Sequence, residues 1–303
     1  MSEATKGVAA MIAACTIWGL SGIFYKLLAH IPPEQVLSHR ILWSGLFFAC
    51  ILAVQGRVGL LGSVLTDWRR VRVLMLATAM ISLNWFIFIT SIQIGRATES
   101  SLGYYIFPLV SVVLGRLFFG EHLSRAQALA IGLAILAVVI LTYGLGVPPW
   151  IALTLGFSFA IYGVVKKRLD IGPVVSVTAE VLLLFPIALT VLALTDGGGF
   201  LNGWQDAGLL MLSGPLTGAP LVLFSYAARR VALGSIGVLQ YLNPTLQALV
   251  ATLVFGELFT PWHSAAFVLI WGAVIIFSLG ALHKSRTEAK AVRPMAPDAT
   301  GAG

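Results

Sequence analysis

The sequence has little charge and almost no cysteine. Only 10% of its 303 residues are charged and 58% are apolar, whereas about 25% of an ordinary soluble domain is charged. So few charged side chains cannot cover the surface of a water-soluble globule, and we expect the chain to be solvated by lipid. The two cysteines, Cys15 and Cys50, lie within apolar runs. They exclude a disulfide scaffold and indicate no redox compartment.

The sequence also lacks the motifs of common enzymes. It has no His-Glu-x-x-His, no paired-aspartate motif, no Gly-x-Gly-x-x-Gly and no Walker lysine. We therefore predict no enzymatic activity, no metal and no cofactor, and any transport would be driven by a gradient rather than by ATP. A repeated pore loop or a ring of like charges, which would indicate a channel, is missing too.

Ten apolar stretches are long enough to cross a membrane. A spanning helix needs about 20 apolar residues for a hydrocarbon core of about 30 Å, and runs such as residues 249–254 do not alternate in hydropathy as β-barrel strands do. We predict an all-α integral membrane protein whose first stretch is an uncleaved helix rather than a signal peptide. The stretches are residues 7–28, 36–55, 73–94, 101–119, 127–143, 150–165, 174–195, 208–228, 234–255 and 264–282.

The basic residues predict the orientation. With ten spans, only Lys26, Arg40 and Arg96 of the 19 lysines and arginines fall on one side. The positive-inside rule makes the other side cytoplasmic, so both termini are expected in the cytoplasm of a bacterium, with the chain in its inner membrane. This topology explains the net charge of +7. Because the basic residues are dispersed over separate loops, no nucleic-acid partner is expected.

The two halves of the sequence match each other. One motif recurs with a shift of 136 residues, and the first two stretches match the sixth and seventh with shifts of 141 and 140. A hydroxyl residue, Ser124 or Thr260, follows each motif and is expected to N-cap the next helix. The motif consists of Tyr105, Pro108, Phe119, Gly120 and Glu121 in the first half and Tyr241, Pro244, Phe255, Gly256 and Glu257 in the second.

An internal duplication with an odd number of spans per copy predicts an inverted repeat. We expect ten transmembrane helices arranged as two inverted five-helix repeats, residues 1–145 and 146–283, followed by a cytoplasmic tail, residues 284–303. Secondary transporters with this architecture bind substrate near the membrane midplane, between the two halves. The partners predicted are therefore a small-molecule substrate and membrane lipid, with the oligomeric state open.

Prolines within the spans are candidate hinges. Pro108 and Pro244 each remove a backbone donor and free a carbonyl that could line a cavity, although a simple packing kink is the alternative. Pro215 and Pro220 lie in the eighth stretch, which is expected to bend or break.

Polar and charged residues within the spans are candidate functional groups, because their burial in lipid is costly. Arg40 and Glu180 occupy matching places in the second and seventh stretches; they are expected to pair with each other or to meet substrate charge, and Glu180 could carry a proton. The alternative, for Glu180 as well as for Arg40, is that the side chain snorkels to the interface. His39 is a weaker proton-relay candidate, and Asn84 either lines a cavity or bonds a neighbouring helix.

These features resemble a known family. Tandem five-helix repeats ending in Gly-Glu are similar to the EamA-type, ten-helix exporters of the drug/metabolite transporter superfamily, and several strings resemble its RarD-like branch. The resemblance covers residues 7–283 and implies an inner-membrane exporter of small metabolites, amino acids foremost. The strings are Ser38-His39-Arg40-Ile41-Leu42-Trp43-Ser44, Asn84-Trp85, Ser101-Leu102-Gly103-Tyr104 and Gln240-Tyr241.

The resemblance also implies where substrate would bind. In such exporters aromatic residues line the cavity, which by position indicates Trp18, Trp85, Tyr105, Phe107, Phe159 and Tyr241; the sequence itself adds Asn84, Tyr162 and Asn243. We therefore predict export of amino acids or similar small metabolites by alternating access. The alternatives are a chloramphenicol-type drug exporter and an integral membrane enzyme acting on lipid-linked substrates.

Overall fold

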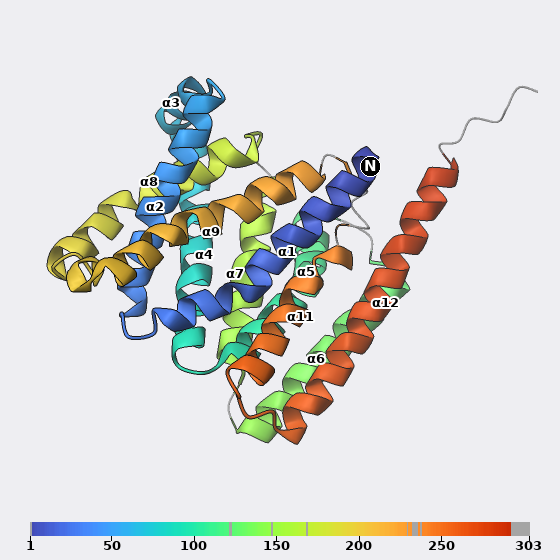
Figure 1. The fold of residues 1–303 in the computed structure, drawn as a ribbon. Helices are drawn as coiled ribbons and strands as arrows, with labels where there is room; N and C mark the ends of the chain where they lie inside the picture. The colour runs from blue at the N-terminus through green and yellow to red at the C-terminus, as the bar shows by residue number, and fades with distance from the viewer. Residues whose placement is uncertain are drawn as a thin grey trace, which may run out of the picture.

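The computed structural model is a bundle of helices (Figure 1). It describes residues 2–120, 123–146, 148–167, 169–228, 230–231, 236 and 238–291, and within these ranges it contains no strand. The α-helices are α1 (Glu3–Leu27), α2 (Pro33–Val54), α3 (Val58–Thr66), α4 (Trp68–Gln93), α5 (Ala97–Phe119), α6 (Arg125–Leu145), α7 (Trp150–Lys167), α8 (Pro173–Leu194), α9 (Trp204–Ala228), α11 (Leu242–Leu249) and α12 (Pro261–Ala291). A 3₁₀ turn, Phe200–Asn202, precedes α9, and a π-helical segment, Val250–Val254, continues α11.

Eight of these helices are long and apolar enough to cross a membrane: α1, α2, α4, α5, α6, α8, α9 and residues Pro261–Gly280 of α12. Two shorter apolar helices, Trp150–Lys166 and Leu242–Val254, lie where the sequence predicts the sixth and ninth spans. At about 1.5 Å per residue, these two are shorter than a hydrocarbon core. The predicted all-helical membrane class is confirmed, and the count of ten spans stays a prediction.

Two helix starts follow the predicted capping. The Ser124 hydroxyl accepts a hydrogen bond from the Gln127 N–H while the Gln127 side chain accepts one from the Ser124 N–H, a complete capping box at the start of α6. At the start of α12, the His263 N–H donates to the Thr260 hydroxyl, and Pro261 is the first helical residue. Both predicted caps are confirmed.

Three features differ from the sequence-based prediction. Residues 58–66, expected as loop, form α3, which packs Val64 against α8 through Val175. The eighth stretch is predicted to bend or break, and the structure shows no break, because α9 runs through Pro215 and Pro220. Neighbouring helices stabilise it there: Gly214 packs directly on the backbone of Trp43 in α2.

The last helix extends beyond the last predicted span, which ends at residue 282, and the cytoplasmic tail at residues 284–303 stays a prediction. The helix α12 continues to Ala291, since the residues after His283 include several good helix formers such as Lys284, Arg286 and Ala289. Residues 292–303 lie outside the described part of the chain.

The helices form a central group with a pair beside it. Figure 1 shows α6 and α12 side by side on one flank and α2, α8 and α9 on the other, with α1, α4, α5, α7 and α11 between them. α5 packs on α7, and α1 packs on both α9 and α11. Small residues allow the close approach: a Cβ built on Gly103 of α5 would lie 2.8 Å from both the Ala152 carbonyl oxygen and Leu155 Cβ of α7.

The crossing of α5 and α7 yields a stability prediction. We expect Gly103→Ala to lower the stability of the purified protein by about 1–3 kcal/mol, because the added methyl group overpacks against a backbone carbonyl. Gly132→Ala on α6 is the matched control, since a Cβ there meets nothing within 4 Å, and it should leave stability unchanged or raise it. The measurement is thermal unfolding in detergent. Equal shifts for the two variants would contradict the packing described.

Candidate functional site

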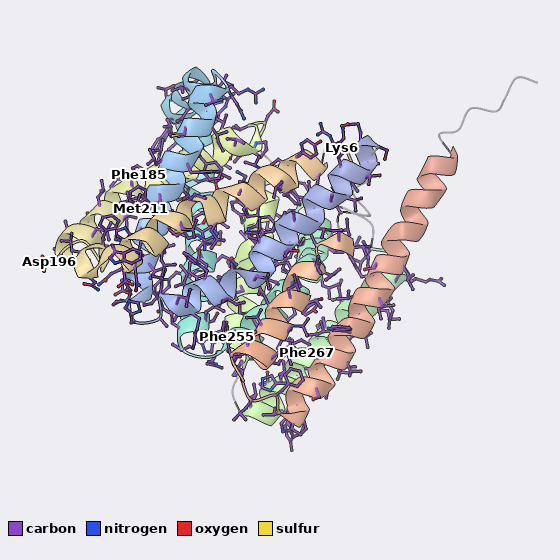
Figure 2. The ribbon with its side chains drawn as sticks, in the orientation of Figure 1. Lys6, Phe185, Asp196, Met211, Phe255 and Phe267 are labelled. Carbon is purple, nitrogen blue, oxygen red and sulfur yellow. The ribbon has the colours of Figure 1, made fainter. Side chains whose placement is uncertain are left out.

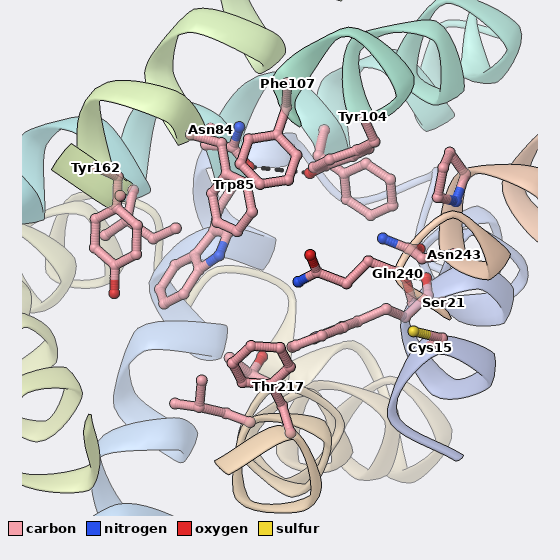
Figure 3. Close-up of a pocket in the computed structure, with 18 of the residues that line it drawn as sticks. Cys15, Ser21, Asn84, Trp85, Tyr104, Phe107, Tyr162, Thr217, Gln240 and Asn243 are labelled. Carbon is pink, nitrogen blue, oxygen red and sulfur yellow. Dashed lines mark hydrogen bonds between the residues drawn. The ribbon is translucent and has the colours of Figure 1, made fainter. Parts of the chain in front are cut away.

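A cavity of about 520 Å³ lies among the central helices. Its size suits a small organic molecule. α1, α2, α4, α5, α7, α8, α9 and the residues around α11 all contribute to its wall, and among the described residues none of the lining side chains lies on α6 or α12. Eleven predicted residues line it: Trp18, Arg40, Asn84, Trp85, Phe107, Pro108, Phe159, Tyr162, Tyr241, Asn243 and Pro244. Figure 3 shows Trp85, Tyr162 and Asn243 around the space.

The other predicted residues lie behind or away from the wall. Tyr105 stacks on Tyr241 with ring centroids 6.2 Å apart, and its hydroxyl is 2.7 Å from that of Thr245. His39 points to the α8–α9 connection, where Nε2 donates to the Gly197 carbonyl at 2.8 Å. Pro215 and Pro220 lie inside α9, next to the cavity residues 216, 217 and 221.

Aromatic rings in mutual contact make up much of the wall. Phe159 of α7 lies 4.9 Å from Phe107 of α5 between ring centroids, and it stacks on Tyr162 at 5.9 Å. Tyr104 of α5 joins this group through Phe159 and reaches Phe88 of α4. Such rings offer a large apolar surface with a few polar edges, the usual composition of a small-molecule pocket.

Asn84 holds three helices together. Its Nδ2 donates to the Leu155 carbonyl at 3.0 Å and to the Ser158 hydroxyl at 3.1 Å, both on α7, while its Oδ1 accepts from the Tyr104 hydroxyl at 3.0 Å. The dashed line in Figure 3 joins Asn84 and Tyr104. Because donors and acceptor are all engaged, this side chain fixes α4, α5 and α7 relative to one another at the cavity wall.

Glu180 pairs with a lysine rather than with Arg40. Its side chain is 2% exposed, and Oε1 accepts from Lys166 Nζ at 2.6 Å and from the Ser176 hydroxyl at 3.0 Å. Its Oε2 accepts from the Tyr162 hydroxyl at 3.1 Å. The predicted pairing of Arg40 with Glu180 is therefore replaced by a Lys166–Glu180 pair, in which hydrogen bonds offset part of the desolvation cost.

Arg40 lies among aromatic rings. Its guanidinium carbon is 4.3 Å from the Trp85 ring centroid and 5.5 Å from that of Tyr25. The residue is 7% exposed, which excludes the alternative that it snorkels to the interface. Cation–π contact with Trp85 gives this buried charge some compensation.

Glu257, known from the sequence only as part of the repeated motif, binds the start of α5. Its carboxylate accepts from the N–H groups of Ala97 and Thr98 at 2.6 and 2.7 Å, and from the Thr98 hydroxyl at 2.7 Å. A carboxylate at the first turn of α5 meets free donors and the positive end of the helix dipole. This contact joins the second half of the chain to the first. Glu121, the matching residue, lies outside the described part of the chain.

Sequence reasoning missed several lining residues, among them Lys166, Tyr104, Gln240 and Gln247. Lys166 was counted only among the basic residues of a cytoplasmic loop. The signal that identifies it is its spacing from Tyr162, since residues four apart share a helix face. The same spacing identifies Gln240, four residues before Pro244, and Gln247, four residues after Asn243.

The Lys166–Glu180 pair yields a second prediction. Glu180→Gln leaves the lysine charge buried without its partner, and we expect a loss of about 3–5 kcal/mol in stability. Lys166→Met combined with Glu180→Gln should recover most of the loss, because no unpaired charge remains. The control Lys6→Gln removes an exposed ion pair with Glu3 and should change little. Thermal unfolding in detergent measures all three; equal effects of Glu180→Gln and Lys6→Gln would contradict the assignment.

Known proteins resemble the chain over almost its whole length. Protein RarD of Streptomyces exfoliatus is 38% identical, covering 98% of this chain and 95% of that protein. An uncharacterized transporter of Bacillus subtilis, YojE, is 37% identical, covering 91% and 95%. The chloramphenicol-sensitive protein RarD of Pseudomonas aeruginosa is 29% identical, covering 94% and 97%.

A solved crystal structure shares the fold, with a TM-score of 0.64 at 17% identity, covering 91% of this chain and 98% of that one. The model of the EamA-like transporter family matches twice, at residues 5–143 and 149–279. The chain therefore belongs to the EamA-like transporter family of the drug/metabolite transporter superfamily, in its RarD-like branch.

Proposed function

We propose that the protein is a secondary transporter that exports amino acids or similar small metabolites across a bacterial inner membrane by alternating access. The observation that carries the proposal is the aromatic-walled cavity between the two halves of the chain. Its lining reaches residues at the ends of α7, α8 and α9.

Equivalent residues of the two halves make equivalent contacts, which supports the inverted repeat. Gly156 of α7 packs against the Gly103 carbonyl of α5. At the equivalent positions, Cys15 of α1 in the first half donates to the Leu239 carbonyl of the second half at 3.5 Å. Positions 15 and 156 differ by 141, and positions 103 and 239 by 136, which are the shifts found between the repeats. The two matches to the family model divide the chain at the same place.

We infer that the cavity opens toward the helix ends that its lining reaches, and this direction supports export. Its lining includes Lys166, Pro173 and Ala228, at the ends of α7, α8 and α9. The contact of Glu257 with α5 lies toward the other end, and Figure 2 shows Phe255, two residues before Glu257, far from Lys6 at the start of α1. With the predicted orientation, the open end faces the cytoplasm. A conformation open to the cytoplasm is the one in which an exporter takes up its substrate.

The proposal predicts counterflow. Purified protein in liposomes preloaded with unlabelled amino acids should accumulate the corresponding radiolabelled amino acid above protein-free liposomes, because a carrier exchanges the two across the membrane. Adding chloramphenicol as a competitor tests the drug alternative, which the chloramphenicol-sensitive relative suggests.

Two tryptophans give matched variants for this assay. Trp18→Ala removes an aromatic group from the cavity and should raise KM or alter the competition profile. Trp68→Ala removes one from the exposed start of α4 and should leave both unchanged. Lack of counterflow across the 20 amino acids, from protein with a cooperative unfolding transition, would contradict the proposal.

A further inference from the structure

Arg40 is a buried cation without a counterion. It is 7% exposed and lines the cavity, and among the described residues it has no ion-pair partner. Its Nε has no hydrogen-bond partner. Lys166, the other basic residue of the cavity lining, is neutralised by Glu180. Burial of an unpaired charge is expensive, so such a group in a membrane protein marks a site where something of opposite charge binds.

The surroundings of Arg40 restrict what that partner is. The guanidinium lies over the Trp85 ring at 4.3 Å, so one face of its plane is covered by an aromatic group. An N–H edge remains for hydrogen bonding, and a planar fork of donors matches a carboxylate in a bidentate arrangement. The rings of Trp85 and Phe107 in the same lining provide apolar surface for the remainder of the molecule.

The same cavity also holds hydrogen-bond acceptors without a partner, in contrast to the donors of Arg40. Gln247 Oε1 and the Tyr241 hydroxyl are buried and have no hydrogen-bond partner. The Gln247 amide nitrogen, by contrast, already donates to Asn243 Oδ1 at 3.0 Å. A free acceptor in a cavity that also holds a free cation suits a molecule with both a carboxylate and N–H donors.

We propose that Arg40 binds the carboxylate of the transported molecule, and that the substrates are carboxylates bearing an aromatic or large apolar group, aromatic amino acids among them. This inference rests on the proposed function and narrows it. A neutral compound lacking a carboxylate leaves the Arg40 charge uncompensated and binds more weakly.

Four probes that differ mainly in charge test the inference: phenylacetate, phenylacetamide, phenylalanine and phenylalaninamide. Binding to the purified full-length protein in detergent, measured by isothermal titration calorimetry, should be at least about tenfold tighter for each acid than for its amide, the effect expected of a charge-assisted hydrogen bond. Equal affinities within each pair, or no binding of any probe, would overturn the inference.

Substitutions of Arg40 test whether this residue causes the preference for acids over amides. Arg40→Gln and Arg40→Met should abolish it by weakening acid binding about tenfold or more while the amides keep their affinity. Arg69→Gln, which removes an exposed arginine of α4, should leave all four affinities unchanged. An acid preference that survives in Arg40→Gln or Arg40→Met would overturn the inference. If neither variant unfolds cooperatively, the comparison of acids with amides on the unmodified protein decides.

Calorimetry needs no transport, so the two proposals fail separately. An acid preference that depends on Arg40, without counterflow in liposomes, contradicts the proposed function and leaves the Arg40 assignment standing. Counterflow without an acid preference supports the proposed function and overturns the assignment of carboxylate binding to Arg40.

Discussion

The free-energy cost of burying a charged side chain away from water is the main constraint on this structure. Every buried charged group that could face lipid must be neutralised, engaged by helix donors or turned to the cavity. Buried Glu180, half-buried Glu257 and buried Arg40 use one solution each: Glu180 pairs with Lys166, Glu257 accepts from the first N–H groups of α5, and Arg40 lies against Trp85 at the cavity. The first and third of these contacts each lie within one half of the chain, whereas the contact of Glu257 with the start of α5 joins the second half to the first.

The cavity exists because packing is tight around it and incomplete at its centre. Gly103 and Gly214 bring α5 onto α7 and α9 onto α2 at backbone contact, while the Asn84 amide joins α4, α5 and α7. Bulky rings line the space and contact one another in different geometries: Tyr104 lies edge to face on Phe159, while Phe159 stacks on Tyr162. The result is a cavity whose wall is built from helices of both halves of the chain.

Much of the fold and part of the site could be predicted from the sequence. Apolar length and capping residues act locally, so the membrane class and the starts of α6 and α12 were predicted correctly. Residues implied by the family resemblance, such as Trp18 and Phe159, do line the cavity, and their role in binding stays a prediction. The partner of Glu180 and the continuity of α9 depend on neighbouring helices, which no local pattern encodes.

Alternating access requires that the cavity be reached from one side of the membrane at a time. Ser225→Cys, at the open end of the cavity, in a chain with both native cysteines replaced by alanine, tests it by labelling with an impermeant maleimide. Val58→Cys and Ile94→Cys, both exposed, mark the predicted cytoplasmic and outer sides. The account predicts that, without substrate, Ser225→Cys is labelled from the same side as Val58→Cys. Labelling from the side of Ile94→Cys, or equally from both sides, would contradict it.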